Sequence, residues 1–226
     1  MLHRILTIGL LAGVAAGATL TAFHLVWTVP LILDAEVYEH LKGELPAEGL
    51  AAAKIALAAA HGDGSMSRNL LTLVANLLFG AGAGFVFAGL FNLLRLNGPK
   101  LGVIWGAAAF VAFSLAPSLG LPPELPGTAA AELGLRQAWF SATVAATAAA
   151  IALLAYNRSA PAIFAALVIA AMPHVIGAPK PAVHESVVPD ALAIEFVAAS
   201  LLSLAMFWLV LGAAIGILSR RFAIGR

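Results

Sequence analysis

Residues 5–40 read ILTIGLLAGVAAGATLTAFHLVWTVPLILDAEVYEH. Their long apolar run indicates that the chain folds in a lipid bilayer. From 5 to 33 its only ionisable side chain is His24, and about 20 mostly apolar residues suffice for a helix to cross a bilayer. Four ionisable side chains then follow within seven residues: Asp34, Glu36, Glu39 and His40. We therefore predict a membrane-spanning helix whose end opens onto an acidic mouth.

The composition of the whole chain is that of a membrane protein. Of the 226 residues, 62% are hydrophobic and 10% are charged, whereas a soluble domain has roughly 25% charged residues. The absence of cysteine excludes disulfides and thiolate metal sites within the chain. The net charge of +1 gives no basic surface for nucleic acid, and no glycine-rich phosphate loop ends in Lys-Ser or Lys-Thr. We expect an all-α, multi-pass protein of the cell's inner (cytoplasmic) membrane that is not an ATPase.

Six segments are apolar enough to be membrane spans. They are residues 5–33, 69–94, 101–119, 137–156, 161–177 and 191–219, of which 161–177 is short and contains two prolines. Residues 1–226 then form a single transmembrane domain whose one sizeable loop is 34–68. Inside that loop, PAEGLAAAKIALAAAHG (46–62) predicts a short helix on the outer membrane surface, since a proline starts it and a glycine follows it.

The basic residues test the number of spans. If the loops alternate from a cytoplasmic N-terminus, seven of the twelve Lys and Arg residues and none of the eleven acids fall on the inner side. An excess of Lys and Arg in short cytoplasmic loops is the positive-inside pattern. Removing one span would place the tail SRRFAIGR (219–226) outside and spoil this partition. We therefore predict six spans with both termini cytoplasmic. The negative outer face would attract cations, although acids that only solubilise the outer loops explain it equally simply.

Glycines and prolines predict how the spans pack. Glycines recur at helix-packing spacing in the first, second and last spans: Gly9, Gly13, Gly17, Gly80, Gly84, Gly212 and Gly216. Such ridges allow close helix contact, either within the chain or with a partner such as a second copy. Pro30, Pro117 and Pro173 lie near the outer ends of three spans. Each would free the carbonyl four residues back, which can line a cation path, or would simply end its helix.

Three ionisable residues lie inside the predicted spans. His24 is near mid-membrane, His174 is about 9 Å deep at 1.5 Å per residue, and Glu195 is about one turn inside the last span. Intramembrane ionisable groups are functional candidates, although a neutral histidine bonded to a neighbouring helix explains each histidine taken alone. Asn76, in the second span, is more typical of a polar contact between helices than of an ion ligand.

Imidazole nitrogens and carboxylate oxygens without sulfur suit a borderline divalent ion such as Co²⁺, Ni²⁺ or Zn²⁺. Their spacing matches no tight-binding motif, and weak ligands on separate helices suit an ion that must leave again. We therefore predict an ion in transit and no tightly bound cofactor. No Gly-x-Ser-x-Gly motif marks a nucleophile, so an enzyme is not expected. The candidate metal ligands are His24, Asp34, Glu36, Glu39, His174, His184, Glu185 and Glu195.

Five stretches together resemble CbtA, a family of predicted cobalt transporter subunits: PLILDAEVYEH (30–40), LAPSLGLPPELPG (115–127), LGLRQAWFSAT (133–143), MPHVIGAPKPAVHESVVPDALAIEF (172–196) and FWLVLGAAIG (207–216). The resemblance implies a membrane component for cobalt uptake, often linked to vitamin B12 synthesis. It also implies a small histidine-rich membrane partner of the CbtB type. The residues that it implicates are Asp34, Glu36, Glu39, Glu124, Arg136, Gln137, His174, His184 and Glu185. Asp34 stands where we expect a glutamate and Phe140 where we expect a tryptophan, and family descriptions count five spans.

Three functions follow as hypotheses, the third being transport of another cargo, such as a different metal or a proton. In the first, the outer acids gather the hydrated divalent ion and His24, His174 and Glu195 pass it inward. In the second, the chain conducts no ion and instead stabilises or gates a partner transporter. Metal selectivity, the energy source and a homo-oligomeric state are all left open by the sequence.

Overall fold

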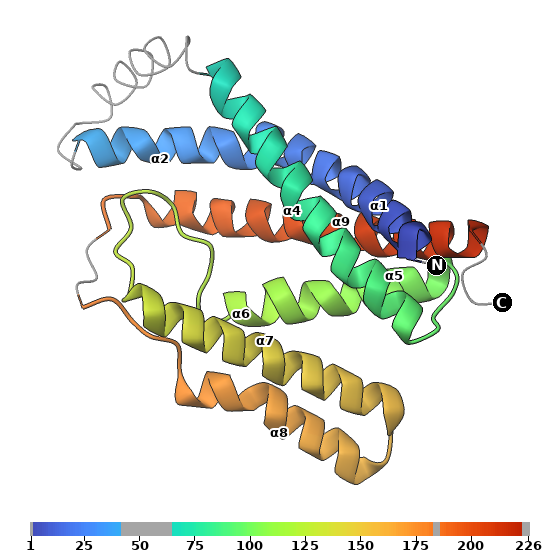
Figure 1. The fold of residues 1–226 in the computed structure, drawn as a ribbon. Helices are drawn as coiled ribbons and strands as arrows, with labels where there is room; N and C mark the ends of the chain where they lie inside the picture. Colours follow the sequence, from blue (N-terminus) through green and yellow to red (C-terminus); the bar gives the residue numbers. More distant parts are fainter. Residues whose placement is uncertain (1, 42–64, 183–185, 223–226) are drawn as a thin grey trace.

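The computed structural model describes residues 2–41, 65–182 and 186–222, and within these ranges the chain is helical, without a strand (Figure 1). The helical segments are α1 (Leu2–Phe23), η1 (His24–Thr28), α2 (Val29–Leu41), α4 (Ser65–Leu93), α5 (Pro99–Phe110), η3 (Val111–Leu115), α6 (Ala116–Ser118), α7 (Leu133–Tyr156), α8 (Ala160–Ile176) and α9 (Asp190–Arg221). Because the π-helical turns η1 and η3 join their neighbours end to end, the segments make up six rods. The predicted surface helix 46–62 lies outside the described residues.

Five of these rods are long and apolar enough to cross a membrane: Leu2–Glu39, Met66–Leu93, Pro99–Ser118, Leu133–Tyr156 and Asp190–Arg221. The sixth, α8, is an apolar helix of 17 residues, in the place where the shortest span was predicted. The chain is therefore an all-helical, multi-pass membrane protein. That α8 also crosses, which would give six spans, stays a prediction.

The first rod does not end where hydropathy placed its end. The apolar run stops at Leu33, and residues from 34 onward were predicted as loop, but α2 continues the helix to Leu41. The reason is packing, since Leu31 and Ala35 of α2 are buried against Phe196 of α9 and the loops before and after the α7–α8 pair. The acidic stretch is therefore helical, and its carboxylates are held on a rod.

Glycines bring two pairs of rods into backbone contact. A Cβ on Gly9 would lie 2.8 Å from the carbonyl oxygen of Gly84, and Gly13 meets Gly80 even more closely, so α1 and α4 pack backbone to backbone. On the other side of the bundle, Gly102 of α5 lies against Gly212 of α9 in the same way. The glycine ridges predicted from the sequence are thus used within the chain.

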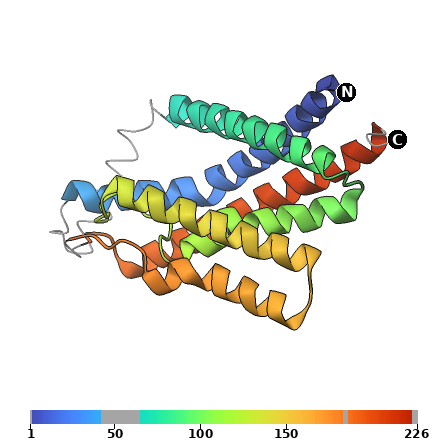
Figure 2. The same ribbon diagram turned by 60° about the horizontal axis from the view of Figure 1, so that its bottom comes forward.

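Helix α9 is the centre of the bundle and packs against α1, α4 and α5 (Figures 1 and 2). Its Phe207 and Leu211 are fully buried with residues of α1, α4 and α5 in the main hydrophobic core. The ring of Trp208 stacks on Phe113 at 5.4 Å, and its indole N–H donates to Ser114 Oγ at 3.1 Å. Helices α7 and α8 form a hairpin at the edge of this core, with α8 packed along α7.

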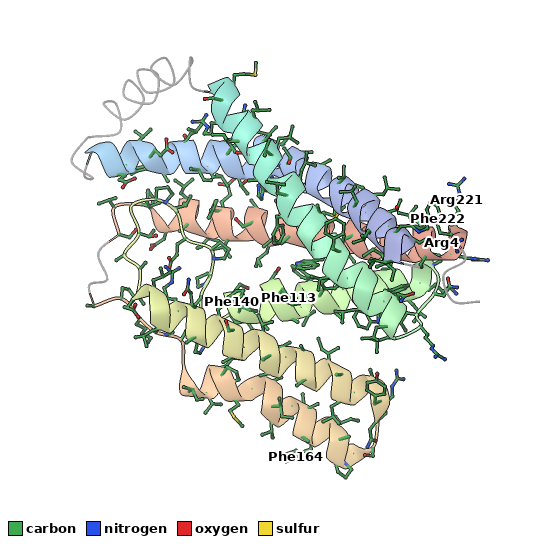
Figure 3. The ribbon with its side chains drawn as sticks, in the orientation of Figure 1. Arg4, Phe113, Phe140, Phe164, Arg221 and Phe222 are labelled. Carbon is green, nitrogen blue, oxygen red and sulfur yellow. The ribbon has the colours of Figure 1, made fainter. Side chains whose placement is uncertain are left out.

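Charge is segregated between the two ends of the bundle. The start of α1, the end of α9, the α4–α5 connection and the α7–α8 turn all lie at one end, and Arg4 and Arg221 are close there (Figures 1 and 3). The acids within the described residues lie on α2, on the loop 119–132 and on the first turns of α9, at the opposite end. An even number of crossings is consistent with this arrangement.

Prolines follow both π-helical turns. Proline lacks an N–H, and its ring clashes with the carbonyl four residues back in a regular helix. The wider turn relieves this crowding, because Val29 N–H bonds to His24 O, and Ala116 N–H to Val111 O, five residues back in each case. Pro30 therefore does not end its helix, whereas Pro117 lies in the last turn before the loop 119–132.

Candidate functional site

The acidic end of the bundle is organised by a second, smaller hydrophobic cluster. It is formed by Leu31, Ala35, Leu125, Val188 and Phe196. These side chains come from α2, the loop 119–132, the segment before α9, and α9 itself. Three stretches that are far apart in the sequence, PLILDAEVYEH, PPELPG and VVPDALAIEF, thus meet in one place.

The carboxylates of α2 lie on the same helix as Leu31 and Ala35 of this cluster. Asp34 and Glu36 are partly buried and Glu39 is exposed. Gly127 fixes the neighbouring loop beside them, because it has φ 81° and its hypothetical Cβ would lie 3.4 Å from Glu39 Cβ and 3.0 Å from Val187. A side chain at position 127 would strain this turn and push the loop away from the acids.

Trp139 of α7 ties together the loop 119–132 and the end of α8. Its indole N–H donates to the carbonyl oxygen of Pro173 at 3.0 Å, and the ring of His174 meets its ring edge-on with centroids 5.6 Å apart. Gly120 lies directly against the indole, and its hypothetical Cβ would be 2.9 Å from Ala178. His174 is therefore positioned on α8 by the indole of α7.

Glu124 and Arg136 form an ion pair that sequence reasoning did not predict as a pair. Arg136 Nη2 donates to Glu124 Oε2 at 2.7 Å, and each side chain is 28% exposed. Glu124 lies in the loop 119–132 and Arg136 in the first turn of α7, so the bond joins loop to helix. Both residues belong to stretches that carry the family resemblance, which was the only signal that could have found them.

His24 lies in a polar cluster between the first rod and α4. Thr21 Oγ1 donates to Gly17 O at 2.9 Å, so the Thr21 oxygen can only accept the 3.1 Å bond from Asn76 Nδ2. The same Nδ2 is 3.2 Å from His24 Nδ1, which must therefore also accept. This places the ring proton on Nε2. Asn76 acts here as a polar contact between helices.

This arrangement is the reverse of that around a typical metal-bound histidine. Such a histidine binds the metal through one nitrogen and donates its other ring N–H to an acceptor. Here Nδ1 faces an N–H donor, so binding at Nε2 would move the proton to Nδ1 and set it against the Asn76 amide. Metal binding at His24 Nε2 would therefore be favoured if Asn76 turned its amide around.

Glu132 caps the N-terminus of α7. Its carboxylate accepts from Gly134 N–H and from Leu135 N–H, both at 2.8 Å. These two backbone hydrogen bonds lower the pKa of Glu132, because they stabilise the charged form. A negative charge at this position also complements the positive end of the helix dipole.

The structure separates the predicted ligands into groups. Asp34, Glu36 and Glu39 lie together on α2, Glu195 is exposed on α9, His24 contacts α4, and His174 contacts α7. Among the described residues, no three His, Asp or Glu side chains come close enough to hold one metal ion. His184 and Glu185 lie outside the described residues. The ligand set predicted from the sequence therefore stays a prediction.

One comparison with known proteins gives a result. The profile of a family described as "Probable cobalt transporter subunit (CbtA)" matches residues 2–220, which is nearly the whole chain. No curated protein matches the chain, and no solved structure does.

Proposed function

Because this chain belongs to the family of probable cobalt transporter subunits, CbtA, we propose that it is the membrane component of a divalent-cation uptake system. Co²⁺ is the expected cargo, with Ni²⁺ and Zn²⁺ as the alternatives. In this proposal the cation is captured at the acidic end of the bundle, which faces outward, while both termini are cytoplasmic. The chain works with a small histidine-rich partner protein in the same membrane.

The grouping of the acids on a helix is the observation that supports capture. Asp34, Glu36 and Glu39 are held within two turns of α2, next to the loop that carries Glu124. A region lined by charges of one sign raises the local concentration of the opposite ion and its rate of arrival. The described basic residues near this end are few, and Arg136 among them is paired with Glu124.

For the passage inward we propose fewer candidate ligands than the sequence predicted. We keep His174 and Glu195 as candidate ligands, since both lie near the acidic end of the bundle. The participation of His24 would be favoured if the Asn76 amide turned, given the hydrogen bonds of that amide. His184 and Glu185 are retained as capture residues on the strength of the family resemblance alone.

Cobalt uptake into liposomes tests the proposal. The purified chain is reconstituted alone and together with the small partner protein, and radioactive cobalt uptake is measured at low salt. Uptake by the chain alone makes it the permease. Uptake only with the partner makes it a non-conducting accessory component, and no cobalt uptake in either case contradicts the proposal.

The capture site is tested by neutralising its carboxylates. In the variant Asp34→Asn/Glu36→Gln/Glu39→Gln we expect the initial uptake rate to fall about tenfold at low salt, and by less at high salt, where surface charges are screened. Arg158→Gln, at the opposite end of the bundle, is the control and should leave the rate unchanged. An unchanged rate in the triple variant, with wild-type uptake present, would exclude these acids as the entry site.

A further inference from the structure

A groove beside the acidic end contains the Glu124–Arg136 pair. It has a volume of about 420 Å³ and lies between the π-turn η3, α7 and α9. Most of its lining is apolar and includes the partly exposed rings of Phe113 from η3 and Phe140 from α7 (Figure 3). Gln137 and Ser141, four residues apart on one face of α7, also line it.

The wall at η3 has a special backbone. Ala116 N–H bonds to Val111 O, and Pro117 has no N–H, so the carbonyl of Ala112 receives no hydrogen bond from either residue. Ser114, the next polar residue of this turn, is fixed by the indole N–H of Trp208 and also lines the groove. The π-turn therefore places Ser114 and Pro117 at the groove wall.

The ion pair sets the charge of this groove. Glu124 and Arg136 are each only 28% exposed, so removing the guanidinium would leave a partly desolvated carboxylate without a counter-charge. A long arginine side chain near a rim can swing outward into water, whereas the burial of Leu125 in the second hydrophobic cluster keeps the neighbouring Glu124 in place. A cation that enters can thus replace the guanidinium without creating an unpaired charge.

We propose that this groove is a divalent-cation site in which Arg136 occupies the position of the ion until the ion arrives. Glu124 is the charged ligand, and Gln137, Ser114 and Ser141 supply neutral oxygens toward the ion or its water. Because these donors are oxygens, the site takes a divalent cation that keeps part of its hydration shell. This proposal rests on the proposed function, since it places a second station on the route of the captured ion.

Two substitutions with opposite expected effects test the site. Equilibrium binding of radioactive Co²⁺ is measured on the full chain in detergent micelles, in the background Asp34→Asn/Glu36→Gln/Glu39→Gln so that the mouth does not contribute. We expect Glu124→Gln to weaken binding about tenfold, because the charged ligand is lost. We expect Arg136→Gln to tighten binding roughly fivefold, which is the effect of removing a competitor held by a partly exposed ion pair.

A structural role for the pair gives a different pattern. If the pair only fastened the loop 119–132 to α7, both single variants would weaken binding alike, and that result would overturn the proposal. No change in Arg136→Gln would overturn it too. Arg136→Lys keeps a competing cation and should bind Co²⁺ like the background. If a single variant is not monodisperse, Glu124→Gln/Arg136→Gln keeps the net charge and must bind as weakly as Glu124→Gln.

The two proposals fail separately. Absent cobalt uptake by the chain, with or without its partner, contradicts the proposed function. Normal uptake, combined with Co²⁺ binding that is indifferent to position 136, leaves that function intact and removes only the groove from the route.

Discussion

At the scale of single residues, hydrogen-bond direction decides what His24 can do. Thr21 donates to Gly17, so Asn76 must present its NH₂ group to Thr21 and to His24. We expect His24 in the resting protein to be the neutral tautomer that carries its proton on Nε2. ¹⁵N NMR of labelled histidine distinguishes the two ring nitrogens and measures this directly.

The matched variant for that measurement is Asn76→Asp. A carboxylate cannot donate to His24 Nδ1, so the ring proton should move to Nδ1 and the two nitrogen signals should exchange character. This variant also offers the acceptor that a metal-bound histidine needs, and Co²⁺ should then perturb the His24 signals. An Nδ1–H tautomer in the wild-type protein would mean that the Asn76 amide has the opposite orientation.

The sequence identified most ionisable residues of the candidate site, but it did not identify which residues contact one another there. His24, His174 and the acids of α2 were found because ionisable groups next to or inside apolar spans are rare. The Glu124–Arg136 bond was not predicted, because the two residues are twelve apart and the sequence does not determine the shape of the loop between them. Pairings of this kind depend on tertiary structure.

At the scale of helices, the glycine contacts between α1 and α4 leave no room for a side chain. In Gly13→Ala the new methyl group would meet the backbone of Gly80, which cannot move aside as a flexible side chain would. We expect this substitution to lower the free energy of unfolding by about 1–3 kcal/mol. Unfolding in detergent micelles, followed by circular dichroism, measures the change.

Gly82→Ala, on α4, the rod against which Gly13 of α1 packs, is the control. No atom lies within 4 Å of a Cβ at Gly82, so the alanine should be neutral or raise the free energy of unfolding by up to about 1 kcal/mol through its helix propensity. Equal destabilisation by both substitutions would show that the backbone contact of Gly13 with Gly80 does not account for the effect.

Helix positions were predictable from the sequence, whereas the end of the first rod was not. All six rods overlap the six predicted apolar segments, because hydropathy over about 20 residues is a strong signal. The end of the first rod was misplaced by eight residues, from Leu33 to Leu41, because packing of Leu31 and Ala35 extends the helix beyond the apolar run. The π-turns before Pro30 and Pro117 were not predicted either, because they are recognised only by backbone hydrogen bonds that reach five residues back.

At the scale of the whole molecule, the number of crossings is the main prediction. The chain lacks cysteine, so single cysteines can be introduced and labelled from one side of a sealed membrane. With six crossings, Asn97→Cys and Ser159→Cys should react on the cytoplasmic side, and Ala130→Cys and Ser186→Cys on the outer side. Membrane-impermeant maleimide on intact cells gives the measurement.

Labelling at Ser186→Cys distinguishes six crossings from a topology in which α8 does not cross the membrane. If α8 did not cross, Ser186→Cys would react on the same side as Asn97→Cys, and α9 would place its arginine-rich end outside. Because Arg220 and Arg221 end α9 and Arg158 follows α7, the positive-inside pattern favours six crossings. The sequence supported this topology through charge alone. The start of α1 and the end of α9 lie at the same end of the bundle, which is consistent with it (Figure 2).

The unequal lengths of the rods have a consequence for the lipid around them. Helix α8 has 17 residues, about 25 Å at 1.5 Å per residue, whereas the hydrocarbon core is about 30 Å thick. The candidate span in the first rod, Leu2–Glu39, has 38 residues and is about 57 Å long. If α8 crosses, as predicted, the bilayer should thin beside it, while the longer first rod should tilt or extend beyond the headgroups. Short-chain lipids should gather beside α8, and the thickness of the host membrane becomes a variable to which this protein responds.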